Sequence, residues 1–188
     1  AEDVLFSAEP DSGYRFDAWG DDFFEEANQS VSHIITSNLH VSATFTKQCL
    51  LTTDATTGGS VSLTYDEHIF DCGTIIDITA TPDSGYDFTG WIGNIDEDDV
   101  IDGQTISVVV ASDKIITANF SAYFILDVST QPEEGGTISI SPEQEQYSSG
   151  DIVSVSATPD TQNGYYFTGW AGDVPVGSEN DNPIVLTM

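Results

Sequence analysis

The sequence predicts an all-β protein built of tandem small antiparallel β modules in an elongated arrangement. Three observations predict this fold class. One aromatic motif occurs three times in the 188 residues. The segments between its copies are short runs rich in β-branched residues, several of which alternate apolar with polar residues between turns. No window shows the apolar stripe of period 3.6 that is typical of an amphipathic α-helix.

The repeated motif runs from an alanine through Pro-Asp and a glycine to Tyr-x-Phe-x-x-Trp. Its copies end at Trp19, Trp91 and Trp170, which lie 72 and 79 residues apart, and the third copy has two extra residues in its turn. A Gly-Gly pair occurs at 58–59 and again at 135–136, with a spacing similar to that of the Trp residues. The repeat unit is therefore about 75 residues long.

These markers divide the chain into three units. They predict a partial repeat 1 over 1–48 that lacks the opening strands, a complete repeat 2 over 49–122, and a partial repeat 3 over 123–188 that lacks the last strand. An unfinished sheet edge in repeat 3 could be completed by a strand from another chain. A strand-exchanging polymer subunit is therefore one functional hypothesis.

Repeat 2 contains four runs that are predicted strands because they are rich in Val, Ile and Thr. In chain order they lie at 60–64, 75–80, 105–110 and 114–120. Gly-Gly, Pro-Asp-Ser-Gly and Ala-Ser-Asp segments separate them, and these residues favour tight turns. The only room for a helix is the short stretch after each Trp.

The aromatic residues of the motif are the predicted anchors of each core. Each can bury roughly 150–250 Å², which a small module needs because it buries proportionally little surface. The alternative is an exposed platform that stacks on sugar rings, for which Tyr65, Tyr123, Phe124 and Tyr147 are candidates. The predicted core residues are Tyr14, Phe16, Trp19, Phe45, Tyr86, Phe88, Trp91, Phe120, Tyr165, Phe167 and Trp170.

Several sub-motifs follow one another in a set order along repeat 2. A Gly-Gly-Ser-Val-Ser strand precedes Ala-Thr-Pro-Asp, then Gly-Tyr-Asp-Phe-Thr-Gly-Trp at 85–91, then Ile-Ile-Thr-Ala-Asn-Phe at 115–120. In this order they resemble the divergent B-repeat family, named after the B repeats of internalins, over essentially the whole chain. The resemblance implies a β-grasp-like module of secreted or wall-attached bacterial proteins, used as a stalk, spacer or adhesive unit without catalytic residues.

Repeat 2 also contains both cysteines, Cys49 and Cys72. Their separation of 23 residues permits a disulfide in an exported protein. By restricting the unfolded chain, such a disulfide would stabilise the fold by roughly 3 kcal/mol. The alternative is two unpaired thiols in a module that folds without them, as its neighbours must. A metal site at the cysteines is disfavoured because His68 is the only histidine of this repeat.

The acidic residues gather in the loop that follows each Trp. In repeat 2 these residues could ligate calcium through several carboxylate oxygens, although the loop lacks the alternation and terminal Glu of an EF-hand. The alternative is a solvated loop that keeps the array soluble. The candidate calcium ligands are Asp96, Glu97, Asp98, Asp99 and Asp102.

The charge of the whole chain excludes several partners. The sequence contains 32 Asp and Glu but only 3 Lys and Arg, for a formal net charge of −29 at pH 7. Nucleic-acid binders need basic residues for the phosphate backbone, and anionic membranes attract cationic surfaces. We expect no nucleic-acid partner and no membrane insertion. The expected partners are neighbouring repeats, with other copies of the chain or surface glycans as alternatives.

No catalytic pattern is present, so we expect no enzyme. There is no nucleophile elbow, and the acids cluster in loops instead of opposing each other in a pocket. Lys47 and Lys114 occupy different positions in the repeat, which disfavours a Lys–Asn isopeptide staple. The leading hypothesis is an extracellular structural or adhesive array, a stalk, spacer, filament or matrix component, without a cofactor unless calcium binds. The alternative is a carbohydrate-binding accessory module of a secreted enzyme.

Overall fold

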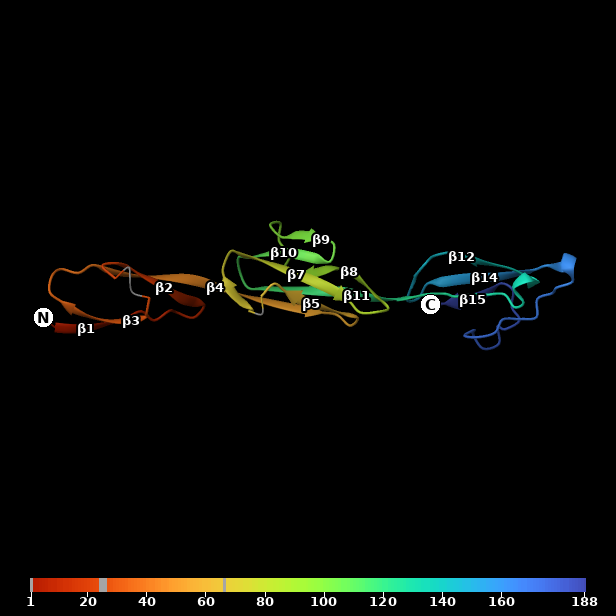
Figure 1. The fold of residues 1–188 in the computed structure, drawn as a ribbon, viewed down its shortest axis with the longest axis horizontal. Helices are drawn as coiled ribbons and strands as arrows, with labels where there is room; N and C mark the ends of the chain where they lie inside the picture. The colour runs from red at the N-terminus through yellow and green to blue at the C-terminus, as the bar shows by residue number, and fades with distance from the viewer. Residues whose placement is uncertain (1, 24–26, 66) are drawn as a thin grey trace. The chain divides into compact units, whose positions relative to one another are not determined.

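The structure, a computed structural model, describes residues 2–23, 27–65 and 67–188 (Figure 1). Strand accounts for 54% of it and helix for 3%. The strands form several small, mostly antiparallel sheets, and none of the sheets formed by the described residues closes into a barrel. The all-β prediction is confirmed. By its contacts the chain divides into unit 1, Ala1–Thr81 with Phe88–Asn119, and unit 2, Pro82–Asp87 with Phe120–Met188.

The bounds of the elements follow the chain from one repeat to the next. They are β1 (Glu2–Ser7), β2 (Tyr14–Asp21), β3 (Ser30–Ile35), β4 (Val41–Ala55), β5 (Gly59–Leu63), β6 (Ile69–Asp71), β7 (Thr74–Pro82), β8 (Tyr86–Gly93), β9 (Val100–Asp102), β10 (Thr105–Val110), β11 (Lys114–Phe124), η1 (Glu133–Gly135), β12 (Gly136–Ser141), β13 (Tyr147–Ser148), β14 (Ile152–Pro159), η2 (Thr161–Asn163) and β15 (Ile184–Thr187). Strands occupy all four predicted runs of repeat 2. In the described residues, the stretches after the three Trp residues contain no helix.

Repeat 1 pairs β1 with β3 and β2 with the first part of β4, both antiparallel. Phe16 and Trp19 lie three residues apart on β2, a spacing that would put them on opposite faces of a regular strand. The register with β4 shifts at Asp17, which is the extra residue of a β-bulge. Because of this bulge both rings join one buried cluster with Ala8 and Phe23.

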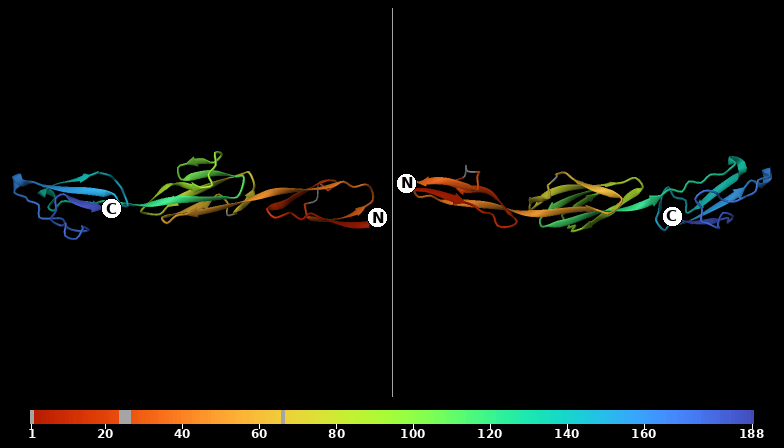
Figure 2. Two further views of the ribbon diagram at one scale, coloured as in Figure 1. Left: turned by 180° about the vertical axis from the view of Figure 1, so that it is seen from behind. Right: turned by 90° about the horizontal axis from the view of Figure 1, so that it is seen from below.

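The 15-residue strand β4 belongs to two repeats. Residues 41–47 pair with β2 of repeat 1, residues 48–50 pair with β6 of repeat 2, and residues 51–55 pair with β11. Figures 1 and 2 show β4 as one ribbon that passes from repeat 1 into repeat 2. The boundary that the sequence markers place between residues 48 and 49 therefore lies inside a strand.

Repeat 2 has a sheet of order β5-β7-β10-β9. Ile76 and Ile78 of β7 lie opposite Val108 and Ile106 of β10, and all four side chains are buried. The alternation of buried and exposed residues along both strands is the period of two that the sequence shows. One face of this sheet therefore lines the core of repeat 2.

A parallel pair, β4 with β11, joins the two ends of repeat 2. Its register runs from Lys114 opposite Leu51 to Ala118 opposite Ala55. The sequence does not predict this pair, because the period of a strand says nothing about its neighbour. Parallel pairing is possible here because the chain between the two strands is long enough to return to the same end. β11 also pairs with β8.

Unit 2 contains the three-stranded antiparallel sheet β12-β14-β15. Its core is a cluster of Tyr147, Val153, Val155 and Ile184. The Tyr147 hydroxyl donates to the Pro142 carbonyl at 3.0 Å. Tyr147, a candidate for an exposed sugar platform, is therefore a core residue instead, since its ring is buried in this cluster.

The predicted core aromatics differ in burial. The most buried are Phe16, Trp19, Trp91 and Phe120. Those with half-buried side chains are Tyr86, Phe88, Tyr165, Phe167 and Trp170. Tyr14 and Phe45 stay 44% and 40% exposed at the edge of the repeat 1 core. Tyr14 is the first residue of β2, and Phe45 meets the Phe16 ring at a centroid distance of 6.1 Å while the rest of its ring stays open.

Candidate functional site

The junction between repeats 1 and 2 is built around β4. Gln48 N donates to the Gly13 carbonyl at 2.8 Å, and Cys72 N donates to the Lys47 carbonyl at 2.9 Å. Gly13 has φ of +82°, a conformation that glycine adopts without strain. The motif turn of repeat 1 and the end of β6 in repeat 2 are therefore both hydrogen-bonded to the same short stretch of β4.

A bidentate ion pair crosses this junction. Arg15 of β2 donates from Nε to Asp71 Oδ1 at 2.8 Å and from Nη2 to Asp71 Oδ2 at 2.6 Å, and its Nη1 reaches Asp17 Oδ1 at 2.8 Å. Two parallel hydrogen bonds fix the orientation of both planar groups. The bonds from Arg15 hold the pKa of Asp71 below its usual value, and those to Asp71 and Asp17 raise the pKa of Arg15.

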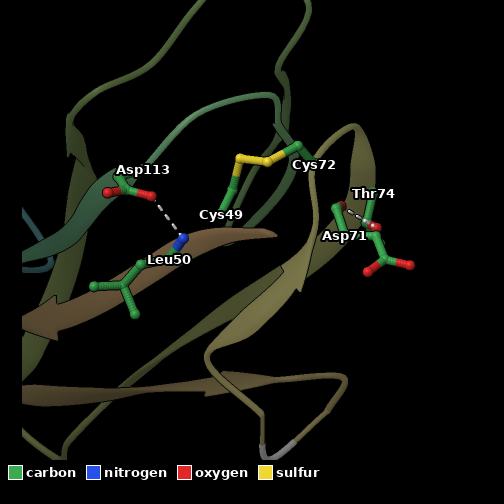
Figure 3. Close-up of a disulfide and its surroundings, with 6 residues drawn as sticks. All are labelled: Cys49, Leu50, Asp71, Cys72, Thr74 and Asp113. Atoms are coloured by element: carbon green, nitrogen blue, oxygen red, sulfur yellow. Dashed lines mark hydrogen bonds between the residues drawn. A yellow bond between two sulfur atoms is a disulfide. The ribbon is translucent and has the colours of Figure 1, made fainter. Parts of the chain in front are cut away.

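The predicted disulfide is present, and Figure 3 shows it together with Asp71 of this ion pair. It joins Cys49 of β4 to Cys72, the residue that follows Asp71 at the end of β6, with the Cα atoms 5.1 Å apart. On the other side of Cys49, the Leu50 amide donates to Asp113 Oδ1 at 2.8 Å. The disulfide thus attaches the strand that contains Asp71 covalently to β4.

Lys114, at the start of β11, is a buried cation. Its side chain is 1% exposed, and Nζ lies 2.7 Å from Oδ2 of Asp99, whose side chain is 0% exposed, and 2.9 Å from Oδ2 of Asp96. The Asp99 carboxylate also accepts the backbone N–H groups of Asp96 and Val109, both at 2.8 Å. A buried carboxylate needs this many partners to offset the loss of hydration.

The protonation states of this pair follow from those contacts. Burial alone would raise the pKa of Asp99, but the hydrogen bonds from the Asp96 amide, from Lys114 and from the Val109 amide hold that pKa below its usual value. Burial alone would lower the pKa of Lys114, but its bonds to Asp99 and Asp96 raise it. Both groups therefore stay charged near neutral pH.

This arrangement occupies part of the acidic loop proposed for calcium. The carboxylates of Asp96 and Asp99 bind the Lys114 ammonium, while Glu97, Asp98 and Asp102 are exposed. Among the described residues no group of three or more His, Cys, Asp or Glu side chains could hold a metal ion. Calcium binding by this loop stays a prediction.

The loop that follows the motif Trp is held by that Trp in repeats 1 and 3 but by another residue in repeat 2. The indole N–H of Trp19 donates to the Asn28 carbonyl at 2.7 Å, and that of Trp170 donates to the Asp181 carbonyl at 2.8 Å. Nε1 of Trp91 is buried and has no hydrogen-bond partner within the described parts of the chain. In repeat 2 the ammonium of Lys114 holds the corresponding loop instead.

Repeat 3 has a groove of about 540 Å³ beside its copy of the motif. The aromatic residues along it are Tyr165, Tyr166, Phe167 and Trp170. Tyr166 is 78% exposed, and the Phe167 and Trp170 rings lie 5.3 Å apart. The negative charge of Glu134, whose carboxylate accepts the Tyr165 hydroxyl, raises the pKa of Tyr165. Unlike Tyr65 and Phe124, which are exposed elsewhere, these rings gather on one surface.

The Arg15–Asp71 and Lys114–Asp99 ion pairs were not predicted from the sequence. The sequence does contain a pattern that indicates the second of them. Lys114, Ile116, Ala118 and Phe120 alternate with other residues along β11, and all four are buried. A period of two therefore places Lys114 on the core side, where a cation requires an acidic partner. Arg15 and its partner are 56 residues apart and show no such pattern.

Comparison with known families identifies the repeat. A family model described as the divergent InlB B-repeat domain matches three consecutive regions, residues 1–49, 49–123 and 126–188. No curated protein and no solved structure matches the chain. In the described residues, no helix has the length and apolar character that a membrane-spanning segment requires.

Proposed function

Because the chain belongs to the divergent InlB B-repeat family, whose members are bacterial surface proteins, we propose that it is a non-catalytic extracellular array that spaces or extends another part of such a protein. The observation that supports this most directly is β4, which passes from repeat 1 into repeat 2 without a linker. A shared strand restricts bending where a glycine-rich or serine-rich segment would allow it. The family is generally non-enzymatic.

Two further features support a spacer. The Arg15–Asp71 pair and the Cys49–Cys72 disulfide both brace the junction around β4, and a disulfide is consistent with a location outside the cell. The net charge of −29 makes neighbouring repeats repel one another, most strongly at low salt.

Small-angle scattering tests the proposal. We expect an elongated, stiff particle whose maximum dimension decreases modestly as salt is added. The matched variant inserts Gly-Ser-Gly-Ser between Lys47 and Gln48, which interrupts β4 at the junction. We expect this variant to be more flexible, with an unchanged far-ultraviolet circular dichroism spectrum. A compact particle at every salt concentration, or an insertion without effect, contradicts the proposal.

Glycan binding is a second candidate function, favoured by the aromatic groove of repeat 3. Exposed aromatic rings stack on the apolar faces of sugars, and Tyr166 is the most exposed of the aromatic residues in this groove. Polysaccharide pull-down with Tyr166→Ala tests it, with Tyr65→Ala as the control at an exposed tyrosine outside the groove. Binding that only Tyr166→Ala abolishes supports the function. An intact chain that binds no polysaccharide contradicts it.

A further inference from the structure

We propose that repeat 2 is a mechanical clamp, in which tension along the chain shears the β4–β11 ladder and the Cys49–Cys72 disulfide limits how much chain is released when the ladder breaks. The proposal rests on the spacer function for its use in the cell. Its mechanical content depends only on the topology of repeat 2.

The topology determines the direction of the load. The chain enters repeat 2 along β4 from repeat 1 and leaves it along β11 toward repeat 3. Because β4 and β11 are parallel neighbours, tension pulls β4 toward its amino-terminal end and β11 toward its carboxyl-terminal end. The two strands are therefore pulled in opposite directions along their common axis. In this shear geometry all the ladder hydrogen bonds resist together, whereas bonds pulled from one end break one at a time.

Contacts on both sides strengthen this ladder. Five residue pairs make up the parallel register, from Lys114 opposite Leu51 to Ala118 opposite Ala55. The Leu50 amide bonds to Asp113 before the ladder, and the Thr56 amide donates to the Ala118 carbonyl at 2.9 Å after it. β6 pairs with residues 48–50 of β4, just before the ladder, and β8 pairs with β11.

The core side of the ladder is closed to water. Leu51 of β4 and Ile116 and Ala118 of β11 are all 0% exposed. At the first position of the ladder, the Lys114 side chain is bound to Asp99 inside the protein. Water that could replace a strained ladder bond therefore has no access from this face of the ladder.

The disulfide lies where the load enters. Cys49 precedes the ladder residue Leu51, and its bond to Cys72 closes a loop with a sequence separation of 23 that contains the β4 residues of the ladder. The intact disulfide therefore passes part of the tension directly to Cys72, and the ladder carries the rest. When the ladder breaks, this loop cannot extend while the disulfide is intact. An extended chain spans at most about 3.5 Å per residue, so oxidation shortens the released length by about 80 Å.

Single-molecule force spectroscopy on the full chain, held by its two ends, tests the clamp. Repeat 2 is expected to unfold at a high force, with a released length that increases by about 80 Å when reductant is added to the same protein. Reduction on the instrument requires no variant and no refolding. The chain must first be shown to contain the disulfide. If reductant then leaves the released length unchanged, the disulfide does not limit that length and this part of the proposal is wrong.

The pulling direction tests the shear itself. Handles at positions 57 and 121, exposed sites beyond the carboxyl-terminal ends of the two ladder segments, would peel β4 from β11 from one end. We expect the peeling force to be several-fold lower than the end-to-end force. Equal forces in the two directions overturn the clamp. The scattering test of the spacer is made without force, so either proposal can fail while the other stands.

Discussion

Arg15 of repeat 1 binds Asp71 of repeat 2 through two parallel hydrogen bonds, 2.8 and 2.6 Å long. Both side chains remain about two-fifths exposed, so water screens the pair and its contribution to stability is small. Its geometric effect is larger, because a bidentate contact sets the relative orientation of the two groups. The pair therefore acts on the angle between the repeats more than on the stability of either one.

We predict that Asp71→Asn loosens the junction with little change in the melting temperature. The amide cannot form the charged bidentate pair, whereas the disulfide and the pairing of β4 with β2 and β6 remain. Nuclear magnetic resonance relaxation should show repeats 1 and 2 tumbling more independently. Asp87→Asn removes the same charge at another exposed position and should leave the tumbling unchanged. Equal behaviour of the two variants would show that the pair does not orient the junction.

Lys114→Met should destabilise repeat 2 strongly. Removing the cation leaves the Asp99 carboxylate buried without its charge partner, a loss typically worth about 3–5 kcal/mol. Lys47→Met, at an exposed lysine, should be nearly neutral. The double variant Lys114→Met with Asp99→Asn should recover part of the loss, because no charge then remains buried and the amide oxygen can still accept a backbone N–H group. Urea unfolding measures all three, and a neutral Lys114→Met would exclude a structural role for the pair.

Low pH should reduce the contribution of Asp99 to stability. Because its pKa is lowered in the folded protein, this contribution is complete above the unfolded value of about 3.9 and is lost as the pH falls through the folded pKa. The stability difference between the wild type and Asp99→Asn should therefore be constant from pH 7 to about 5 and decrease below about 4. A difference that does not change down to pH 2 would contradict the assignment.

The double substitution Cys49→Ser with Cys72→Ser should destabilise repeat 2 by about 3 kcal/mol, because the unfolded chain regains the freedom of the closed loop. Hydrogen exchange measured by mass spectrometry can resolve the effect along the chain. Exchange should accelerate in β6 and in the ladder of β4 with β11 but not in β14 of repeat 3. Reduced wild-type protein should behave like the variant. Uniform acceleration along the chain would show that the disulfide does not act locally.

The sequence predicts where the strands of repeat 2 lie better than it predicts which strands pair with one another, for a physical reason. Alternation along one strand shows which side chains face the core, so β7 and β10 appear where the pattern places them. The parallel pairing of β4 with β11 and the Arg15–Asp71 contact join residues far apart in the chain. No local pattern encodes either. Burial of Lys114 is readable in principle, but the general expectation that lysine is exposed opposes it.

The bulge at Asp17 leads to a prediction about chain length. Deleting Asp17 leaves Phe16 and Trp19 two positions apart, so a regular strand then places both rings on the core face and keeps the register with β4. We therefore expect this deletion to preserve the repeat 1 cluster, with loss only of the exposed contact to Arg15.

Deleting Thr44 on the partner strand β4 is the matched control. Thr44 lies opposite Ala18, directly beside the bulge but on the strand that has no extra residue. Its loss therefore moves the side chains on one side of the deletion to the other face of the strand. Hydrogen exchange of β2 and β4 should remain slow in the Asp17 deletion and become fast in the Thr44 deletion. If both deletions unfold repeat 1, the bulge is not what places Trp19 beside Phe16, and the spacing of the motif must be explained by a contact outside these two strands.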